Sequence, residues 1–379
     1  MTNIIERMRQ NGAEKKMADF QVKQKLPYPV KKAYAEVRAY EFYRECWKKG
    51  LNCHVSVGGL DSITLFFFLK SLNIEIPAVS VSCLEDKSIQ KIHKELGVIP
   101  LKPLKSKAAV IKEFGYPVIS KEAANKISQL QHPSEQNKTV RHAIMTGETG
   151  EFGGFRKNTR MRLAQRWLEL FGGYENENEG TNYLKPDFLV SDKCCYYLKE
   201  KPCDDWAKEH GSVPFLGLMA SEGGRRQKSL MLNGCNYFGK TTIRSAPFAI
   251  FSRQDLLQLA LDLCVPVPEI YGEIRQGADG MLFTTGAQRT GCSMCGFGIQ
   301  KELTRPHRFD LLYQQRPSDW HFWLEKAGFG EVFDWMGFRW RQPFIPGEKS
   351  WLSQKEMSEL LAERREKNNG QLSFFDDEI

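Results

Sequence analysis

The stretch CHVSVGGLDSITLFFFLK, residues 53–70, decides the fold of this chain. Residues 54–57 form a short β-like run, and residues 62–73 form an apolar run that predicts a helix with little polar surface. Gly58 and Gly59 join the two runs. A glycine-rich turn from a strand into a helix leaves backbone N–H groups unpaired at the positive end of the helix dipole. The junction therefore predicts an anion-binding site.

The other residues of this turn add to the prediction. Gly58 and Gly59 let phosphate oxygens approach the backbone, while Ser56 and Ser62 supply hydroxyl donors. Phosphate would repel Asp61 unless that carboxylate caps the helix or holds Mg²⁺, and both roles suit the first helical turn. A tight turn with a helix cap is the simpler interpretation of two glycines, but the strand before and the helix after favour a phosphate site.

Composition narrows the class of protein. Of 379 residues, 41% are hydrophobic and 26% are charged, and the apolar runs are too short to cross a bilayer. The first residues lack the apolar segment of a signal peptide, so we expect a cytoplasmic protein that does not enter a membrane. A formal net charge of +8 favours polyanionic partners such as nucleic acid, although a solvated basic surface is the commoner reason for such an excess.

The order of patterns along the chain predicts an α/β fold with a parallel sheet, because β-like runs alternate with helical ones. The β-like runs are 54–57, 76–83 and 212–220, and the helical ones are 31–49, 62–73, 88–97 and 253–263. Residues 130–190 are rich in Gly, Asn and Glu and indicate an insertion or loop region.

Ten cysteines in a reducing compartment indicate metal or redox chemistry rather than a disulfide framework. Five of them stand singly and are best interpreted as buried thiols, whereas DKCCYYLKEKPC and RTGCSMCGFG hold the rest. An adjacent Cys-Cys pair suits the separate iron corners of a cubane better than a single tetrahedral zinc. The pattern predicts a [4Fe–4S] cluster on Cys194, Cys195, Cys292 and Cys295, with a structural zinc as the rival and Cys203 as a spare or reactive thiol.

The turn at residues 56–62 resembles the S-G-G-x-D-S loop of the PP-loop ATP pyrophosphatase superfamily, which binds the phosphates of an adenine nucleotide. Val57 replaces the usual serine, and Leu60 stands where many members carry lysine. The cysteines resemble those of the adenylyl-sulfate and phosphoadenosine phosphosulfate (PAPS) reductase branch, in which C-C-x-x-x-K-x-x-P and a later C-x-x-C hold the cluster. Lys199 and Pro202 match the first of these motifs, and the resemblance implies that Lys199 lies beside the cluster.

Further segments resemble the same family. FLGLMASEGGRR matches its G-x-R-x-x-E-x-x-R segment at Glu222 and Arg225, which implies an arginine facing anionic substrate groups, although Met219 replaces the first arginine. GYPVISKEAANKI resembles the loop after the second strand, and the resemblance implies that Lys121 reaches the nucleotide. RSAPFAIFSRQDLLQLALDLCVPVPEIY resembles the family's P-x-x-x-W-x-x-x-D-V segment, with Phe251 in place of the tryptophan. Asp255 starts a helix there, and a plain N-cap is the simpler interpretation of it.

One departure bears on the reaction. Sulfonucleotide reductases attack with a cysteine in a C-terminal E-C-G-L-H tail, but no cysteine follows Cys295 here. Without that thiolate, either Cys203 or another thiol substitutes, or the scaffold performs different chemistry. Relatives of the latter kind adenylate an oxygen, release pyrophosphate and install sulfur or nitrogen, several of them on nucleic acid.

The end of the chain carries an independent pattern. Ser353 and Glu356 have capping-box spacing and predict a helix over 353–367. The following tail contains QLSFF, Gln371 to Phe375, which resembles the peptide by which bacterial DNA-processing proteins bind the sliding clamp. Packing of these residues back onto their own domain is the alternative.

These observations predict four regions: an N-terminal segment at 1–30, a PP-loop, PAPS-reductase-like domain at 31–305, a helical region at 306–367 and a flexible tail at 368–379. The resemblance implies an oxidoreductase or transferase that binds ATP or PAPS, with Mg²⁺ as a further ligand, and that uses the cluster in sulfur-related chemistry, including sulfur transfer to nucleic acid. The alternatives are a sulfonucleotide reductase with a displaced cysteine and a non-catalytic, DNA-associated iron–sulfur protein. The expected catalytic residues are Asp61, Lys199 and Arg225.

Overall fold

The computed structural model describes residues 2–151, 154–156, 161–173, 183–292 and 295–373. For residues 2–11, 149–151, 154–156, 225 and 367–373 it describes the backbone alone. The chain divides into two compact units, each made of two chain segments. Unit 1 comprises residues 1–104 and 198–293, and unit 2 comprises residues 105–197 and 294–379. These boundaries differ from the sequence boundaries at 30, 305 and 367.

Unit 1 contains a six-stranded sheet in the order β3-β2-β1-β7-β9-β8. All neighbours are parallel except the hairpin β8–β9, so the predicted mixed α/β fold with a mostly parallel sheet is confirmed. The strands are β1 (Asn52–Ser56), β2 (Ala78–Ser80), β3 (Ile99–Pro100), β7 (Ser212–Leu216), β8 (Asn236–Phe238) and β9 (Ile243–Ser245). A separate antiparallel pair joins β10 (Ile274–Gln276) to β11 (Leu282–Thr284).

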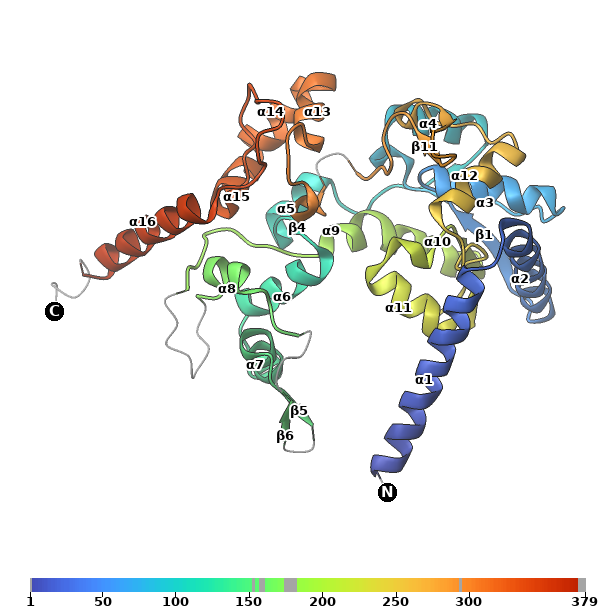
Figure 1. Ribbon diagram of the computed structural model, residues 1–379, viewed down its shortest axis with the longest axis horizontal. Coiled ribbons are helices and arrows are strands. Elements are labelled where there is room, and N and C mark those ends of the chain that lie inside the picture. The colour runs from blue at the N-terminus through green and yellow to red at the C-terminus, as the bar shows by residue number, and fades with distance from the viewer. Residues whose placement is uncertain (1, 152–153, 157–160, 174–182, 293–294, 374–379) are drawn as a thin grey trace. The chain divides into compact units, whose positions relative to one another are not determined.

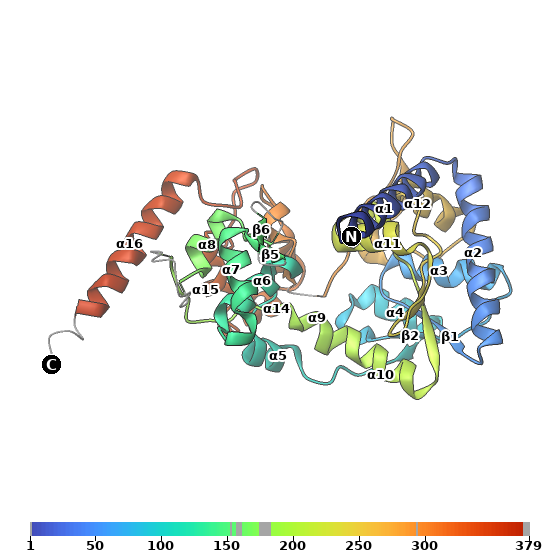
Figure 2. The ribbon, with the colours of Figure 1, turned by 90° about the horizontal axis from the view of Figure 1, so that it is seen from below.

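Helices cover both faces of this sheet. Three consecutive residues of β1, 53–55, are buried, which requires cover on each side because side chains alternate along a strand. Cys53 contacts Cys46 of α2, whereas the ring of His54 lies 5.1 Å from that of Trp206 in α10. The helices of unit 1 are α1 (Thr2–Gln24), α2 (Tyr28–Lys48), α3 (Leu60–Ser71), α4 (Lys87–Glu95), α10 (Lys201–Glu209), α11 (Gly224–Asn233) and α12 (Arg253–Asp262). Both ribbon views show α1 beside α11 (Figures 1 and 2).

Unit 2 has its own aromatic core, in which Phe309, Phe333 and Phe338 are almost completely buried. Its helices are α5 (Lys107–Phe114), α6 (Lys121–Gln131), α7 (Lys138–Thr146), α8 (Gln165–Phe171), α9 (Lys193–Cys195), α13 (Arg308–Gln315), α14 (Pro317–His321), α15 (Phe329–Met336) and α16 (Gln354–Ser373). Two short strand pairs join β4 (Val118–Ile119) to β12 (Gly296–Phe297) and β5 (Thr149–Glu151) to β6 (Gly154–Arg156).

Several local predictions meet the structure here. The loop prediction for 130–190 is wrong in part, since α7 and α8 lie within it. The capping box is confirmed, because Ser353 and Glu356 exchange backbone-to-side-chain hydrogen bonds of 2.8 and 3.3 Å. Asp255 is not the N-cap of α12: Ser252 is, and the Asp255 carboxylate pairs with buried Lys31 at 2.8 Å. Among the described residues, no helix is both long enough and apolar enough to span a bilayer.

Candidate functional site

The turn between β1 and α3 is held in shape by its own residues. β1 ends at Ser56, and Gly59 precedes the first helical residue, Leu60. The hydroxyl of Ser62 accepts a hydrogen bond from the Gly58 amide at 2.7 Å and donates one to the Gly59 carbonyl at 3.0 Å. The Ser62 hydroxyl therefore closes the turn, whereas the sequence predicts that it donates a hydrogen bond to phosphate.

The start of α3 leaves backbone donors available. The amide of Leu60 donates to the hydroxyl of Tyr271 at 3.2 Å, and Thr290 lies 2.7 Å from the same hydroxyl. The amides of Gly59 and Asp61 have no hydrogen-bond partner in the part of the chain that the structure describes. Because they stand at the positive end of a helix of 12 residues, they favour an anionic ligand.

A cavity of about 300 Å³ lies over this turn, and all residues that line it belong to unit 1. Residues 56, 58–62 and 216–218 contribute to it, so it lies beyond the carboxyl ends of β1 and β7. The chain proceeds from β1 outward through β2 to β3, whereas β7 lies on the other side of β1. The cavity thus occupies the point where strand order reverses, which is the usual ligand position in open α/β sheets.

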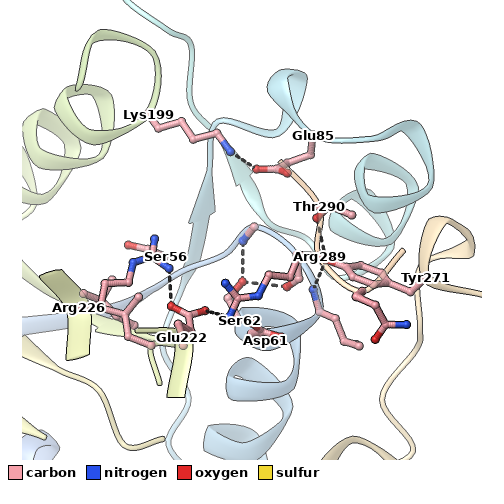
Figure 3. A pocket seen from close by; sticks show the side chains of 17 residues that line it. Ser56, Asp61, Ser62, Glu85, Lys199, Glu222, Arg226, Tyr271, Arg289 and Thr290 are labelled. Atoms are coloured by element: carbon pink, nitrogen blue, oxygen red, sulfur yellow. Dashed lines mark hydrogen bonds and ion pairs between the residues drawn. The ribbon is translucent and has the colours of Figure 1, made fainter. Parts of the chain in front are cut away.

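Opposite charges pair around the cavity (Figure 3). Lys199 contacts Glu85 at 2.6 Å on one side. On the opposite side, Arg226 and Arg289 approach the same carboxylate, Glu222, at 2.5 and 3.5 Å. The two arginines are 58% and 61% exposed at their side chains, so they are free to turn toward a ligand while Glu222, at 8%, stays in place.

These arginines add two cations to those that the sequence predicts for the site. Arg226, next to the predicted Arg225, lines the cavity, and Arg225 lies in α11 with only its backbone described. Arg289 gave no signal in the sequence except its place three residues before Cys292. Both supply positive charge near the turn, where the sequence has Leu60 and no lysine.

Burial and neighbouring charges shift the pKa values of Asp61 and Lys199. Burial raises the pKa of Asp61, while Arg253, 2.5 Å away, opposes that rise. Burial alone would lower the pKa of Lys199, but the neighbouring Cys292 and Glu85 raise it above its ordinary value. Lys199 is therefore a stable cation at the edge of the cavity, bonded to the second cysteine motif.

A buried histidine supports the turn, and no sequence pattern singled it out. His93 of α4 is 2% exposed, and its Nε2 donates to the Gly58 carbonyl at 2.9 Å. The hydroxyl of Ser82 lies 2.9 Å from Nδ1. Because a carbonyl only accepts, Nε2 carries the proton, and burial lowers the pKa of His93, which favours this neutral form.

The four motif cysteines divide between the units. Cys194 and Cys195 lie in α9 and Cys295 precedes β12, all in unit 2, whereas Cys292 belongs to unit 1. Cys194 is buried, and the other three are half-buried. Within the described residues, no group of three or more Cys, His, Asp or Glu side chains is close enough to hold a metal ion.

Two further sequence predictions concern residues of unit 2. Lys121 begins α6 in unit 2 and is not among the lining residues. The backbone of Gln371 to Ser373 continues α16, so this helix ends later than the 353–367 that the sequence predicts. Phe374 and Phe375 lie outside the described residues, and clamp binding stays a prediction.

No known family model matches the chain, and no curated protein matches it either.

Proposed function

We propose that the protein is an adenine-nucleotide-binding enzyme of the PP-loop type that resembles the PAPS reductases in its cysteine motifs and carries out sulfur transfer. The observation that carries this proposal is the cavity at the point where strand order reverses, over a glycine turn with two unpartnered amides. Phosphates bind these amides and draw Arg226, Arg289 and Lys199 away from their carboxylates. Ser56 and Gly58 shape the floor of the site, and Asp61, which lines the cavity, would hold Mg²⁺.

The cysteines Cys194, Cys195, Cys292 and Cys295 would hold a [4Fe–4S] cluster. Four thiols in the Cys-Cys and Cys-x-x-Cys pattern are a suitable donor set. When bound, the cluster supplies a redox-active, negatively charged centre for sulfur-related chemistry. Lys199, bonded to both Cys292 and Glu85, stabilises negative charge at the cavity.

Cys203 argues for this chemistry over that of a sulfonucleotide reductase. Burial and the adjacent Asp204 raise the pKa of the Cys203 thiol to about 11. Such a thiol is almost entirely protonated at neutral pH, whereas the attacking group of a reductase is a thiolate. Cys203 is therefore a poor replacement for the missing tail cysteine.

Nucleotide titration of anaerobically purified protein tests the first half of the proposal. We expect ATP or PAPS to bind, and Arg289→Gln to weaken binding about tenfold, because the substitution removes one phosphate partner. Lys94→Gln, an exposed lysine of α4, is the matched control and should bind as the wild type does. If no adenine nucleotide binds, the cavity is not a nucleotide site. Pyrophosphate release from ATP and sulfite release from PAPS then separate sulfur transfer from reduction.

Metal analysis tests the second half. We expect about four irons per chain, as for a cubane cluster, and loss of iron in the Cys194→Ser variant. Cys83→Ser changes an exposed cysteine outside the motifs and should keep the iron. Stoichiometric zinc without iron after anaerobic reconstitution would refute the cluster.

A further inference from the structure

A long part of unit 1 next to the cavity carries positive charge without any acid. Residues 223–254 contain six Lys or Arg residues and no Asp or Glu. The whole chain has 46 acids in 379 residues, so about four would be expected in a stretch of 32 (46/379 × 32). The stretch begins directly after Glu222 and ends before Asp255, and it forms α11 and the hairpin β8–β9.

The structure joins these elements into one surface. Arg226 of α11 lines the cavity, and Arg244 of β9 donates to the Ser229 hydroxyl of α11 at 3.3 Å. Lys228 neighbours Ser229 on the helix, and Lys240 lies at the turn of the hairpin. The term basic face is used for the cations Arg226, Lys228, Lys240 and Arg244 together with Tyr237.

Most of this charge is not neutralised within the protein. Lys228 and Lys240 are exposed, and neither has an ion pair with any described residue. Arg244 has Nη1 buried without a hydrogen-bond partner, and its guanidinium lies 5.9 Å from the ring of Tyr237. Of the four cations, Arg226 pairs with an acid, and that acid belongs to the cavity.

An aromatic side chain accompanies the cations on the edge strand β8. Tyr237 faces Arg244, to which it is opposite in the strand register. The next residue, Phe238, points to the other face of the strand, where its ring lies 5.2 Å from that of Phe42 in α2. Single-stranded nucleic acid is bound by cations that contact its phosphate backbone, together with aromatic rings on which its bases stack.

From these observations we infer that the basic face binds a single-stranded nucleic acid and leads it to the cavity, so that the acceptor of the proposed reaction is a nucleic acid strand. This inference rests on the proposed function of the cavity. The lengths agree: α11, with 10 residues, is about 15 Å long. That is the rise of about four stacked nucleotides at 3.4 Å each.

Fluorescence anisotropy with a labelled 20-nucleotide single strand, as RNA and as DNA, tests the inference. The face variant is Lys228→Glu/Lys240→Glu, and the control is Lys91→Glu/Lys94→Glu, two exposed lysines of α4 with no recorded ion pair among the described residues. Both variants change the charge equally. At about 0.1 M salt we expect the face variant to bind at least tenfold more weakly, and the control to stay within about twofold of the wild type.

The salt dependence gives a second readout. Loss of two phosphate contacts should reduce the slope of log K against log salt by about 1.4 in the face variant alone. Equal loss of affinity in both variants would overturn the inference, and so would a duplex that binds as tightly as the single strand. Displacement of the strand by polyglutamate at equal charge concentration would also overturn it, because the face would then be a site for acidic protein.

ATP titration of the same proteins separates this inference from the proposed function. We expect both double variants to bind ATP as the wild type does, and to melt at the same temperature. Loss of strand binding in the face variant with ATP binding retained supports the inference. Absence of ATP binding in all three proteins refutes the proposed function and, with it, delivery of the strand to the cavity.

Discussion

Single buried residues set the geometry of the candidate site. The Gly58 peptide is fixed on both sides, its amide by Ser62 and its carbonyl by His93. A carbonyl held in this way cannot rotate into the cavity, where it would repel phosphate. His93 is therefore a positioning residue, although it lies outside the set of residues that line the cavity.

Substitution of His93 tests this role. His93→Leu removes the hydrogen bond to the half-buried Gly58 carbonyl, a loss of about 1–3 kcal/mol, so we expect ATP affinity to fall about tenfold. His93→Gln keeps an N–H donor and should restore most of the affinity. Calorimetric titration measures both. Equal affinity of the Leu and Gln variants would show that packing, not the hydrogen bond, matters.

A second histidine makes unit 1 sensitive to acid. His54 is 1% exposed, and burial, with a smaller effect of His210, lowers its pKa to about 4. Its unfolded pKa is about 6.5, so between these values the unfolded chain binds the extra proton. The stabilisation by neutral His54 is therefore complete above pH 6.5 and is lost as the pH falls toward 4.

Urea unfolding of unit 1 at pH 7 and pH 5 checks this expectation. His54→Gln lacks the titrating group, so the stability difference between wild type and variant should shrink by about 2 kcal/mol from pH 7 to pH 5. A difference that is the same at both pH values would mean that His54 keeps an ordinary pKa.

At the scale of elements, the strand ends and the first turn of α3 are packed too closely for larger residues. A Cβ at Gly59 would lie 2.2 Å from the Tyr271 hydroxyl and 3.0 Å from that of Thr290. A Cβ at Gly217, after β7, would meet the Asp61 carbonyl oxygen at 2.9 Å. Glycine is required at both positions because β1, β7 and α3 converge there.

We expect Gly59→Ala to weaken ATP binding at least tenfold, because Tyr271 must move and release the Leu60 amide (about 1–3 kcal/mol for the lost contact). The added Tyr271→Phe removes the clashing hydroxyl and should restore part of the affinity. Gly12→Ala, where nothing lies within 4 Å of the added Cβ, is the control. Normal ATP affinity of Gly59→Ala would exclude a tight turn as the binding element.

At the scale of the whole molecule, each unit has a separate hydrophobic core. One core surrounds the sheet of unit 1 and includes Phe248, and the other includes Phe333 in unit 2. Units with their own cores unfold as separate cooperative transitions when few contacts couple them. We therefore expect two thermal transitions.

Calorimetry of two core variants tests this prediction. Phe248→Ala and Phe333→Ala each remove a fully buried ring and should cost about 3–5 kcal/mol. Each should lower one transition and leave the other in place. A single transition whose calorimetric and van't Hoff enthalpies agree would show that the units unfold together.

The sequence by itself determined the β1–α3 junction and the parallel sheet. Both follow from local rules: glycines permit the turn, and apolar runs specify buried strands and the helix α3, which begins at Leu60, two residues before the predicted start. Of the cations that line the cavity, the sequence predicts Lys199 but not Arg226 or Arg289, because a side chain's place relative to a cavity depends on packing. Arg225 and Arg226 are adjacent in sequence, and Lys121 lies in the other unit.

Only the tertiary structure identified His93, Tyr271, Arg289 and the basic face. Their partners are distant in sequence: His93 is 35 residues from Gly58, and Tyr271 is 211 residues from Leu60. No periodicity or motif encodes such a pair, since the contact arises from the order of strands in the sheet. The division into two units could not be predicted either, because each unit is built from two segments that are far apart in the sequence.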